Sequence, residues 1–182
     1  MMEFYSITTT TPVGDFHMIV EHTMENKNMK NDVVLVSGFG NLDKLRKRLP
    51  KELQSITLEE VKSRHPYEKF IVQYFKGDSS ALKNIPYQQT GSEFNQDVWH
   101  SISKVKFGKT ISYKELALKA GRPAAIRAVG TACGLNRLVL IIPCHRIIRS
   151  DGKIGEYLYG QKIKNYLLET EKAAKIYTQN SA

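Results

Sequence analysis

Short apolar and β-branched runs alternate with turn-forming residues in the first forty positions, and this pattern predicts β-strands. Residues 4–8 and 16–20 are two such runs on either side of Gly14, so they predict a pair of strands around a turn. Residues 33–36 form a third run, and residues 23–32 predict a polar loop. We therefore expect a small sheet at the start of the chain.

Apolar residues at helical spacing follow this sheet. Leu42, Leu45 and Leu49 recur at intervals of three and four residues before Pro50, which ends the segment. Residues 67–75 predict another short helix. This half shows no evident nucleophile–base pair, glycine-rich phosphate loop or repeat, so we expect a small α+β domain with a supporting role.

After a polar connector over residues 76–91, the pattern predicts mainly helices. Ser92 can cap a helix whose apolar residues share one face. That face carries Phe94, Val98, Trp99 and Ile102. We expect Trp99, the only tryptophan, to lie in the core rather than at a ligand.

A helix-turn-helix is predicted next. Ser112 and Glu115 form a capping box that opens a helix, and Gly121 is placed to end it in a left-handed conformation. Pro123 suits the first position of a second helix, which we expect to run to Cys133.

The second helix of this pair has one buried stripe and an otherwise small surface. Ile126, Val129 and Cys133 form the stripe, and the other positions are Ala, Gly or Thr apart from Arg127. Such a helix can lie close to a neighbouring helix or in a DNA groove, with one long basic side chain projecting.

The charge of the chain favours DNA. The 182 residues carry 27 Lys and Arg against 18 Asp and Glu, a formal net charge of +9. Residues 1–91 hold 12 basic and 11 acidic residues, and residues 92–182 hold 15 and 7, so the halves carry +1 and +8. A basic half is the pattern expected of a polyanion-binding domain, and a merely soluble basic surface is the alternative.

A candidate nucleophile lies in the same half. Residues 138–142 are an apolar run that predicts a buried strand, and Pro143 ends it. Cys144, His145 and Arg146 follow directly, which would place a thiol at a strand end beside an imidazole and a guanidinium. The alternative is that Cys144 is a small apolar side chain of the core, as most lone cysteines are.

The two cysteines also bear on the cellular compartment. Cys133 and Cys144 do not suggest a disulfide framework, and a reducing cytoplasm would keep Cys144 as a thiol. No window approaches the ~18 apolar residues of a membrane span. The first four residues lack the features of a signal peptide. We therefore expect a cytoplasmic protein that does not contact a membrane.

The residues around Cys144 resemble the active-site motif of the O6-alkylguanine-DNA alkyltransferases, also called methylated-DNA–protein-cysteine methyltransferases. The motif here reads Ile142-Pro143-Cys144-His145-Arg146-Ile147. The resemblance continues without gaps through Phe107, Gly108, Tyr113, Arg127, Asn136, Gly155, Glu156, Tyr157 and Glu171. The first half resembles the family's variable ribonuclease-H-like domain only in general layout.

The resemblance implies a fold and an activity. Residues 1–88 would form a small ribonuclease-H-like α/β scaffold, and residues 89–182 a mainly helical, winged-helix-like domain that contains the helix-turn-helix. The fold class is then α+β. The protein would flip O6-alkylguanine, and O4-alkylthymine, out of double-stranded DNA through the minor groove. The alkyl group would pass irreversibly to Cys144, once per molecule, without any cofactor or metal. We expect a monomer, and the sequence does not decide whether it binds cooperatively along DNA.

The resemblance also assigns roles to residues. His145 would take the thiol proton through a bridging water, and Glu171 would orient it. Tyr113 would push on the 3′ phosphate and protonate the leaving guanine. Arg127 would replace the flipped base, and Asn136 would brace the turn before Cys144. Further DNA contacts are implied for Lys114, Arg122, Ala128, Thr131 and Ser150. The base pocket would be lined by Ile147, Tyr157, Leu158 and Tyr159.

Three departures from the family pattern change the expectations. Arg137 stands where proline is usual, which bears on the stiffness of the turn. Tyr159 stands where some members have a small residue, so we expect a narrow pocket. No cysteine precedes Cys133, and His17 and His22 alone make a weak metal site, so we expect no structural zinc.

Three other functions remain as alternatives. A non-catalytic alkyltransferase-like damage binder would replace the motif cysteine, which is present here. A winged-helix DNA-binding regulator would explain the helix-turn-helix and the charge but not Cys144 and His145. A cysteine hydrolase would explain those two residues but not the small, basic helix.

Overall fold

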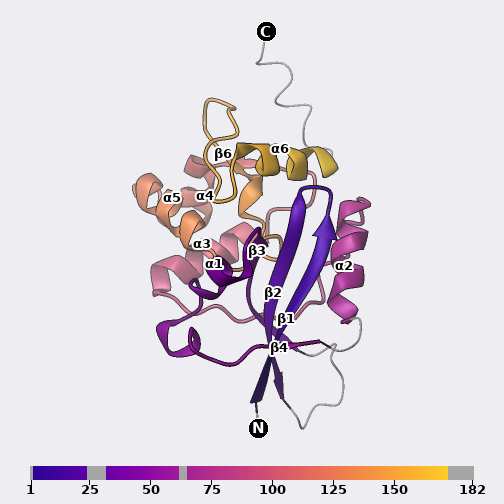
Figure 1. The fold of residues 1–182 in the computed structure, drawn as a ribbon. Helices are drawn as coiled ribbons and strands as arrows, with labels where there is room; N and C mark the ends of the chain where they lie inside the picture. Colours follow the sequence, from indigo (N-terminus) through magenta and orange to yellow (C-terminus); the bar gives the residue numbers. More distant parts are fainter. Residues whose placement is uncertain (1, 24–31, 62–64, 172–182) are drawn as a thin grey trace. The chain divides into compact units, whose positions relative to one another are not determined.

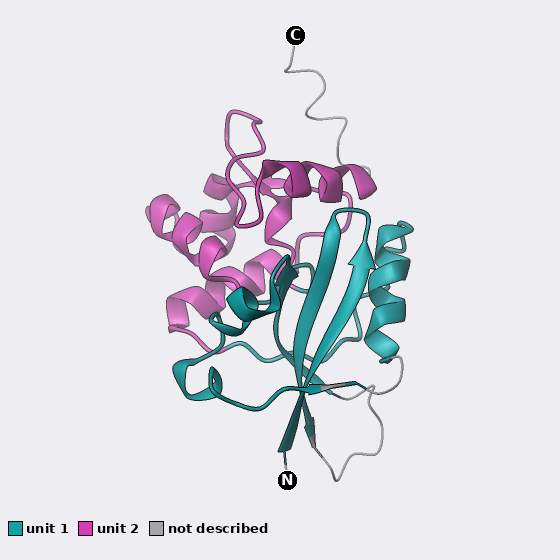
Figure 2. Ribbon diagram, in the orientation of Figure 1, with its two compact units in different colours: residues 1–89, 137–141 teal, residues 90–136, 142–182 magenta. Residues whose placement is uncertain are grey.

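The computed structural model describes residues 2–23, 32–61 and 65–171 (Figure 1). Residues 1–89 and 137–141 form one compact unit, unit 1, and residues 90–136 and 142–182 form unit 2 (Figure 2). We expected a single boundary after residue 88, and the division differs because residues 137–141 belong to unit 1. The expected polar loop of residues 23–32 lies largely outside the described residues.

Unit 1 is built on a four-stranded sheet in the order β3-β2-β1-β4. β1 (Met2–Thr11) and β2 (Gly14–Thr23) form an antiparallel hairpin, and β3 (Val33–Phe39) pairs antiparallel with β2. β4 (Glu59–Glu60) pairs parallel with β1. The three strands predicted from the apolar runs are confirmed. Gly14 ends the hairpin turn at φ 107°, a conformation that favours glycine.

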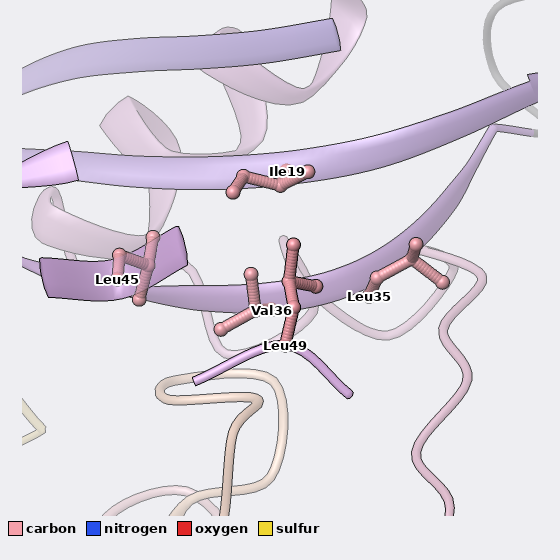
Figure 3. Close-up of a cluster of buried hydrophobic side chains, with 5 residues drawn as sticks. All are labelled: Ile19, Leu35, Val36, Leu45 and Leu49. Carbon is pink, nitrogen blue, oxygen red and sulfur yellow. The ribbon is translucent and has the colours of Figure 1, made fainter. Parts of the chain in front are cut away.

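Both faces of the inner strand β2 are covered, because every residue from Phe16 to Val20 is buried. α1 (Leu42–Arg46) packs on β3 and β2, and α2 (Pro66–Phe75) packs on β1. The two helices predicted in this half are confirmed, although the first is shorter and a 3₁₀ turn, η2 (Lys51–Leu53), follows it. A buried cluster of Ile19, Leu35, Val36, Leu45 and Leu49 joins α1 and the segment after it to the sheet (Figure 3).

The end of the expected connector also belongs to unit 1. Val34 N donates to Pro86 O at 2.9 Å and Gln88 N donates to Val34 O at 3.0 Å, so this extended segment bonds to the edge of β3. The backbone groups of an edge strand are thereby partly satisfied.

Unit 2 contains four α-helices within the described residues. These are α3 (Glu93–Ser103), α4 (Tyr113–Lys119), α5 (Ile126–Leu135) and α6 (Gln161–Thr170). α3, α4 and α5 pack on one another. Trp99 of α3 is buried as expected, and its Nε1 donates to Ala132 O of α5 at 2.8 Å.

The predicted helix ends of unit 2 are confirmed at three places. Ser92 Oγ accepts from Asn95 N at the start of α3. Ser112 Oγ accepts from Glu115 N, and the Glu115 carboxylate accepts from Ser112 N, which is the capping box of α4. Gly121 follows α4 at φ 70°. The prediction that Pro123 starts α5 is wrong. Residues 122–125 form a turn, and α5 begins after it, at Ile126.

The predicted buried strand over residues 138–142 is also wrong. Only Leu138 makes a β-bridge, to Ser37, while residues 139–141 turn and Leu140 has φ 70°. Ser37 N donates to Arg137 O and Ser37 Oγ donates to Val139 O, both at 2.8 Å, so the segment is held by one residue of β3. The run is largely buried as expected, with Ile141 half-buried, but burial alone does not fix an extended backbone.

Candidate active site

The candidate nucleophile, Cys144, is the first residue of a short turn, and hydrogen bonds hold the chain before and after this turn. Cys144 opens the 3₁₀ helix η3 (Cys144–Arg146), and β6 (Ile147–Ile148) follows it and pairs parallel with β5 (Ile111–Ser112). Cys144 N donates to Ile142 O at 2.8 Å around Pro143, which has the φ −81° and ψ 65° of an inverse γ-turn. Cys144 is buried, with 8% of the residue exposed.

His145, Arg146 and Glu171 form a buried hydrogen-bonded cluster beside this thiol. His145 Nε2 lies 2.7 Å from Glu171 Oε1. Arg146 donates to both carboxylate oxygens, from Nε at 2.8 Å and from Nη2 at 2.9 Å, while its Nη1 donates to Val105 O at 2.6 Å. Gly108 N adds a further bond to Glu171 Oε2 at 3.2 Å. Glu171 is thus the acceptor that connects α6 to the nucleophile turn.

The charges of this cluster follow from burial and pairing. Burial alone would raise the pKa of Glu171, but the bonds and charges of His145 and Arg146 outweigh it and hold that pKa well below its usual range. Burial lowers the pKa of His145, and this effect outweighs the opposing effect of Glu171. The ion pair is therefore between Arg146 and Glu171, and His145 is a neutral imidazole.

The tautomer of His145 follows from the same contacts. An ionised carboxylate only accepts hydrogen bonds, so the neutral imidazole carries its hydrogen on Nε2, facing Glu171. Nδ1 is then the nitrogen with the basic lone pair. Arg146 is buried and bonds to both carboxylate oxygens of Glu171, so it fixes the local structure of this cluster.

Gly108 fits this cluster for a backbone reason. It has φ +73°, and a Cβ at this position would come within 2.7 Å of Glu171 O. Only glycine therefore allows the segment after Phe107 to approach the end of α6. The family resemblance includes Gly108, but the sequence alone does not show which residue Gly108 approaches.

Replacement of Gly108 by alanine is expected to lower the free energy of unfolding by about 1–3 kcal/mol, the usual size of such backbone strain. It should also slow alkyl transfer, because the alanine methyl group displaces the Glu171 backbone. Urea denaturation and single-turnover rates measure both effects. Gly134→Ala is the matched control, since Gly134 has no positive φ and no atom within 4 Å of an added Cβ. Equal stability of the two variants would contradict this account.

The turn before the nucleophile is closed by Asn136. This residue caps the end of α5, is buried, and donates from Nδ2 to Ile142 O at 2.8 Å. Arg137, which replaces the usual proline, donates its N–H to Gln89 Oε1 at 2.5 Å within unit 1. A proline has no such hydrogen. The departure at residue 137 thus exchanges ring stiffness for a hydrogen bond.

Tyr113 is half-buried at the first position of α4. Its ring lies close to two glycines, because a Cβ on Gly155 would be 3.7 Å from its Cε2 and one on Gly130 would be 4.0 Å from its Cε1. Burial raises the pKa of Tyr113, and the nearby Cys133, Cys144 and Glu156 act in the same direction. The phenol therefore keeps its proton at neutral pH.

The predicted DNA-contact residues are mostly exposed. This applies to Lys114, Arg127, Ala128, Thr131 and Ser150. Arg122 differs, because it is half-buried and pairs with Asp97 at 2.9 Å, with its guanidinium 5.9 Å from the centre of the Phe94 ring. Its ion pair holds α3 to the turn after α4, and a DNA contact would have to compete with that pair.

The predicted pocket residues occupy different environments. Ile147 is buried directly after η3, whereas Leu158 is 52% exposed. The rings of Tyr157 and Tyr159 meet edge to face at 6.0 Å. Cys133 is buried in the core as expected, and burial raises its pKa, so it is an unreactive thiol.

Sequence reasoning missed Lys164 of α6, which is fully buried. The signal was available in the helical spacing, since Lys164 shares a face with the buried residues Leu167, Leu168 and Glu171. Val105 was missed as well, and it contributes only a backbone carbonyl, which no side-chain pattern can reveal.

Two further observations concern metals and membranes. Among the described residues, no group of three or more His, Cys, Asp or Glu side chains could hold a metal ion. His17 bonds to Thr8 Oγ1 and Gly40 O, and His22 bonds to Asp32. Within the described ranges, no helix has the length and apolar character needed to cross a bilayer.

Comparisons with known proteins agree with this geometry. Residues 93–173 match the family described as 6-O-methylguanine DNA methyltransferase, DNA binding domain. A methylated-DNA–protein-cysteine methyltransferase of Methanosarcina barkeri is 38% identical over 136 residues, covering 74% of this chain and 84% of the relative. One of Saccharomyces cerevisiae is 31% identical over 180 residues and covers 93% of both chains.

A solved structure extends the likeness to the whole fold. The crystal structure of Mycobacterium tuberculosis OGT in complex with DNA matches at a TM-score of 0.70 and 26% identity, over 94% of each chain. The binder, regulator and hydrolase alternatives are not favoured by these similarities. The chain therefore belongs to the methylated-DNA–protein-cysteine methyltransferase family, whose activity is alkyl-transfer repair of DNA.

Proposed function

We propose that this protein repairs O6-alkylguanine in double-stranded DNA. It transfers the alkyl group to Cys144 and thereby restores guanine. The observation that carries the proposal is the cluster that follows Cys144, in which neutral His145 bonds to ionised Glu171 and Arg146 holds that carboxylate with two hydrogen bonds. This arrangement supplies a base to a nucleophile from the neighbouring residue of the same turn.

The thiol is activated by proton removal. An unperturbed cysteine has a pKa near ~8.5, so only a small fraction is thiolate at neutral pH. Nδ1 of His145 takes the Cys144 proton through a bridging water while Glu171 holds the imidazolium that forms. The sulfur then bonds to the alkyl carbon, and the bond between that carbon and the guanine oxygen breaks. Tyr113 gives its phenolic proton to the leaving guanine.

Delivery of the base is assigned to the helix-turn-helix. The exposed face of α5 would enter the minor groove, with Ala128 and Thr131 allowing close approach and Arg127 filling the space of the flipped base. Lys114 and Ser150 would contact phosphates. Asn136 would couple α5 to the nucleophile turn, because it caps α5 and bonds to Ile142.

The remaining expectations follow the same scheme. We propose ribonuclease-H-like topology for unit 1, which serves as a scaffold, and winged-helix-like topology for unit 2. The protein would act as a cytoplasmic monomer, and O4-alkylthymine would be a second substrate. The S-alkylcysteine product is a thioether that no described residue is placed to cleave, so each molecule acts once and no cofactor takes part.

The stoichiometry of repair tests this function. Limiting protein is incubated with excess duplex that carries O6-methylguanine, and the restored guanine is measured over time. We expect a single phase that stops at one guanine per protein molecule. Continued turnover would indicate a hydrolase, and binding without any restored guanine would indicate a damage binder.

Tyr159 is expected to limit the size of the alkyl group. Its ring packs on Tyr157, and we expect it to narrow the proposed pocket, so benzyl groups should react much more slowly than methyl groups. Tyr159→Gly should raise the benzyl rate and leave the methyl rate nearly unchanged, because only the larger group needs the space. Competition between O6-methylguanine and O6-benzylguanine measures the ratio. Equal methyl and benzyl rates in the unmodified protein would refute this prediction.

A further inference from the structure

Lys164 is a buried charge that the proposed reaction does not use. Its side chain has no solvent exposure, and it lies on the face of α6 that also buries Leu167 and Leu168. Burying an ammonium group is costly unless it is well bonded. A methionine of similar length would fill the same space without that cost, so the lysine is a candidate for a chemical role.

The partners of Lys164 are two backbone carbonyls. Nζ donates to Ile147 O at 2.6 Å and to Glu156 O at 3.3 Å. Ile147 is the first residue after the turn Cys144–Arg146, and Glu156 directly precedes Tyr157. One ammonium group therefore ties the nucleophile turn to the segment that carries the proposed pocket residues.

An ionised Cys144 or Cys133 would interact favourably with the charge of Lys164. Within the described part of the chain no carboxylate forms an ion pair with it. Burial lowers the pKa of Lys164 to about 8, whereas Cys144, Cys133 and Glu156 act to raise it. Lys164 in turn helps to lower the pKa of His145. Among these groups, Cys144 is the one whose ionisation the transfer requires.

We propose that Lys164 is a positioning residue of this site, which ties the chain at Glu156 to Ile147 and whose ammonium group stabilises the thiolate of Cys144. The proposal rests on the proposed function, in which Cys144 accepts the alkyl group. A positive charge near a sulfur favours the thiolate over the thiol. Lys164 thus complements His145, which accepts the proton, by stabilising the anion that remains.

The test measures the reactivity of Cys144 without DNA. The rate of its alkylation by iodoacetamide is followed against pH in a Cys133→Ala background, so that Cys144 is the reacting thiol. Lys164→Met should move the midpoint of the pH profile upward by about one unit and lower the rate at pH 7 about tenfold. Lys162→Met removes the same charge from an exposed position of α6 and should change the rate less than about twofold.

A second variant separates the effect of the Lys164 charge from that of its hydrogen bonds. Lys164→Gln keeps an N–H donor for the carbonyls but no charge, so it should move the midpoint as far as Lys164→Met while melting closer to the unmodified protein. Were Lys164→Met not to fold, the glutamine variant would decide alone. A folded variant of either kind with an unchanged midpoint would overturn the proposal. Failure of the proposed function would instead be seen as absent methyl transfer from duplex DNA, which this thiol assay does not involve.

Discussion

Replacement of Cys144 by alanine is expected to abolish alkyl transfer completely while leaving binding to alkylated duplex DNA within about twofold of the unmodified protein. The thiol is the only group of the variant that changes, and the proposed DNA-contact residues lie on α4, on α5, in the turn between them and in the loop at Ser150. Restored guanine and the dissociation constant at fixed salt measure the two effects, because salt strongly affects binding to DNA.

Cys133→Ala is the matched control for this experiment. Cys133 is also a buried free thiol, but burial raises its pKa and no base is bonded near it in the described residues. We expect this variant to repair one guanine per molecule at nearly the unmodified rate. Residual transfer by Cys144→Ala, or loss of transfer by Cys133→Ala in a folded protein, would show that Cys144 is not the acceptor.

Arg146→Met is expected to cost about 3–5 kcal/mol of folding free energy, because it leaves the buried Glu171 carboxylate without its bidentate partner. Glu171 would then draw a proton onto His145, so the base nitrogen would be occupied at neutral pH. Transfer should be slow at pH 7 and should recover as the pH rises. Arg149→Met is the control, since Arg149 pairs with Asp151 on the surface and its loss should matter little.

The pH dependence of the free energy of unfolding tests the charges assigned to this cluster. In the unmodified protein the pKa of His145 lies below its ordinary value near ~6.5, so its contribution to stability is lost as the pH falls below that value. In Arg146→Met the pKa of His145 should be raised, so its contribution is present below ~6.5 and lost at higher pH. Urea denaturation between pH 6 and pH 8 should therefore show a stability gap that widens with pH. A gap that narrows would contradict the assigned charges.

Local sequence rules predicted the parts of the fold that depend on neighbouring residues. Ser112 and Glu115 are three positions apart, and their reciprocal bonds need only one helical turn, so the start of α4 was predictable. Residues 138–142 were mistaken for a strand because their backbone is set by Ser37, about a hundred positions earlier in the chain. Likewise, the start of α5 depends on the conformation of the turn that follows α4.

In the site, too, local features could be predicted from the sequence and contacts between distant residues could not. The motif at Cys144 and His145 was visible in sequence, and the resemblance supplied Glu171, which spacing alone would not have chosen over Glu169. The bidentate bond from Arg146 and the close approach of Gly108 join residues far apart in the chain, so only the structure reveals them. Lys164 was hidden because a lysine in an amphipathic helix is ordinarily read as exposed.

Peptide mapping of the protein after reaction tests the central claim most directly. The protein is incubated with excess duplex carrying O6-methylguanine labelled in its methyl group, then digested and sequenced by mass spectrometry. We predict one labelled methyl group per molecule, on the peptide that contains Cys144 and on its sulfur. Label on Cys133 or on any other residue, or a repaired duplex with unlabelled protein, would contradict this account.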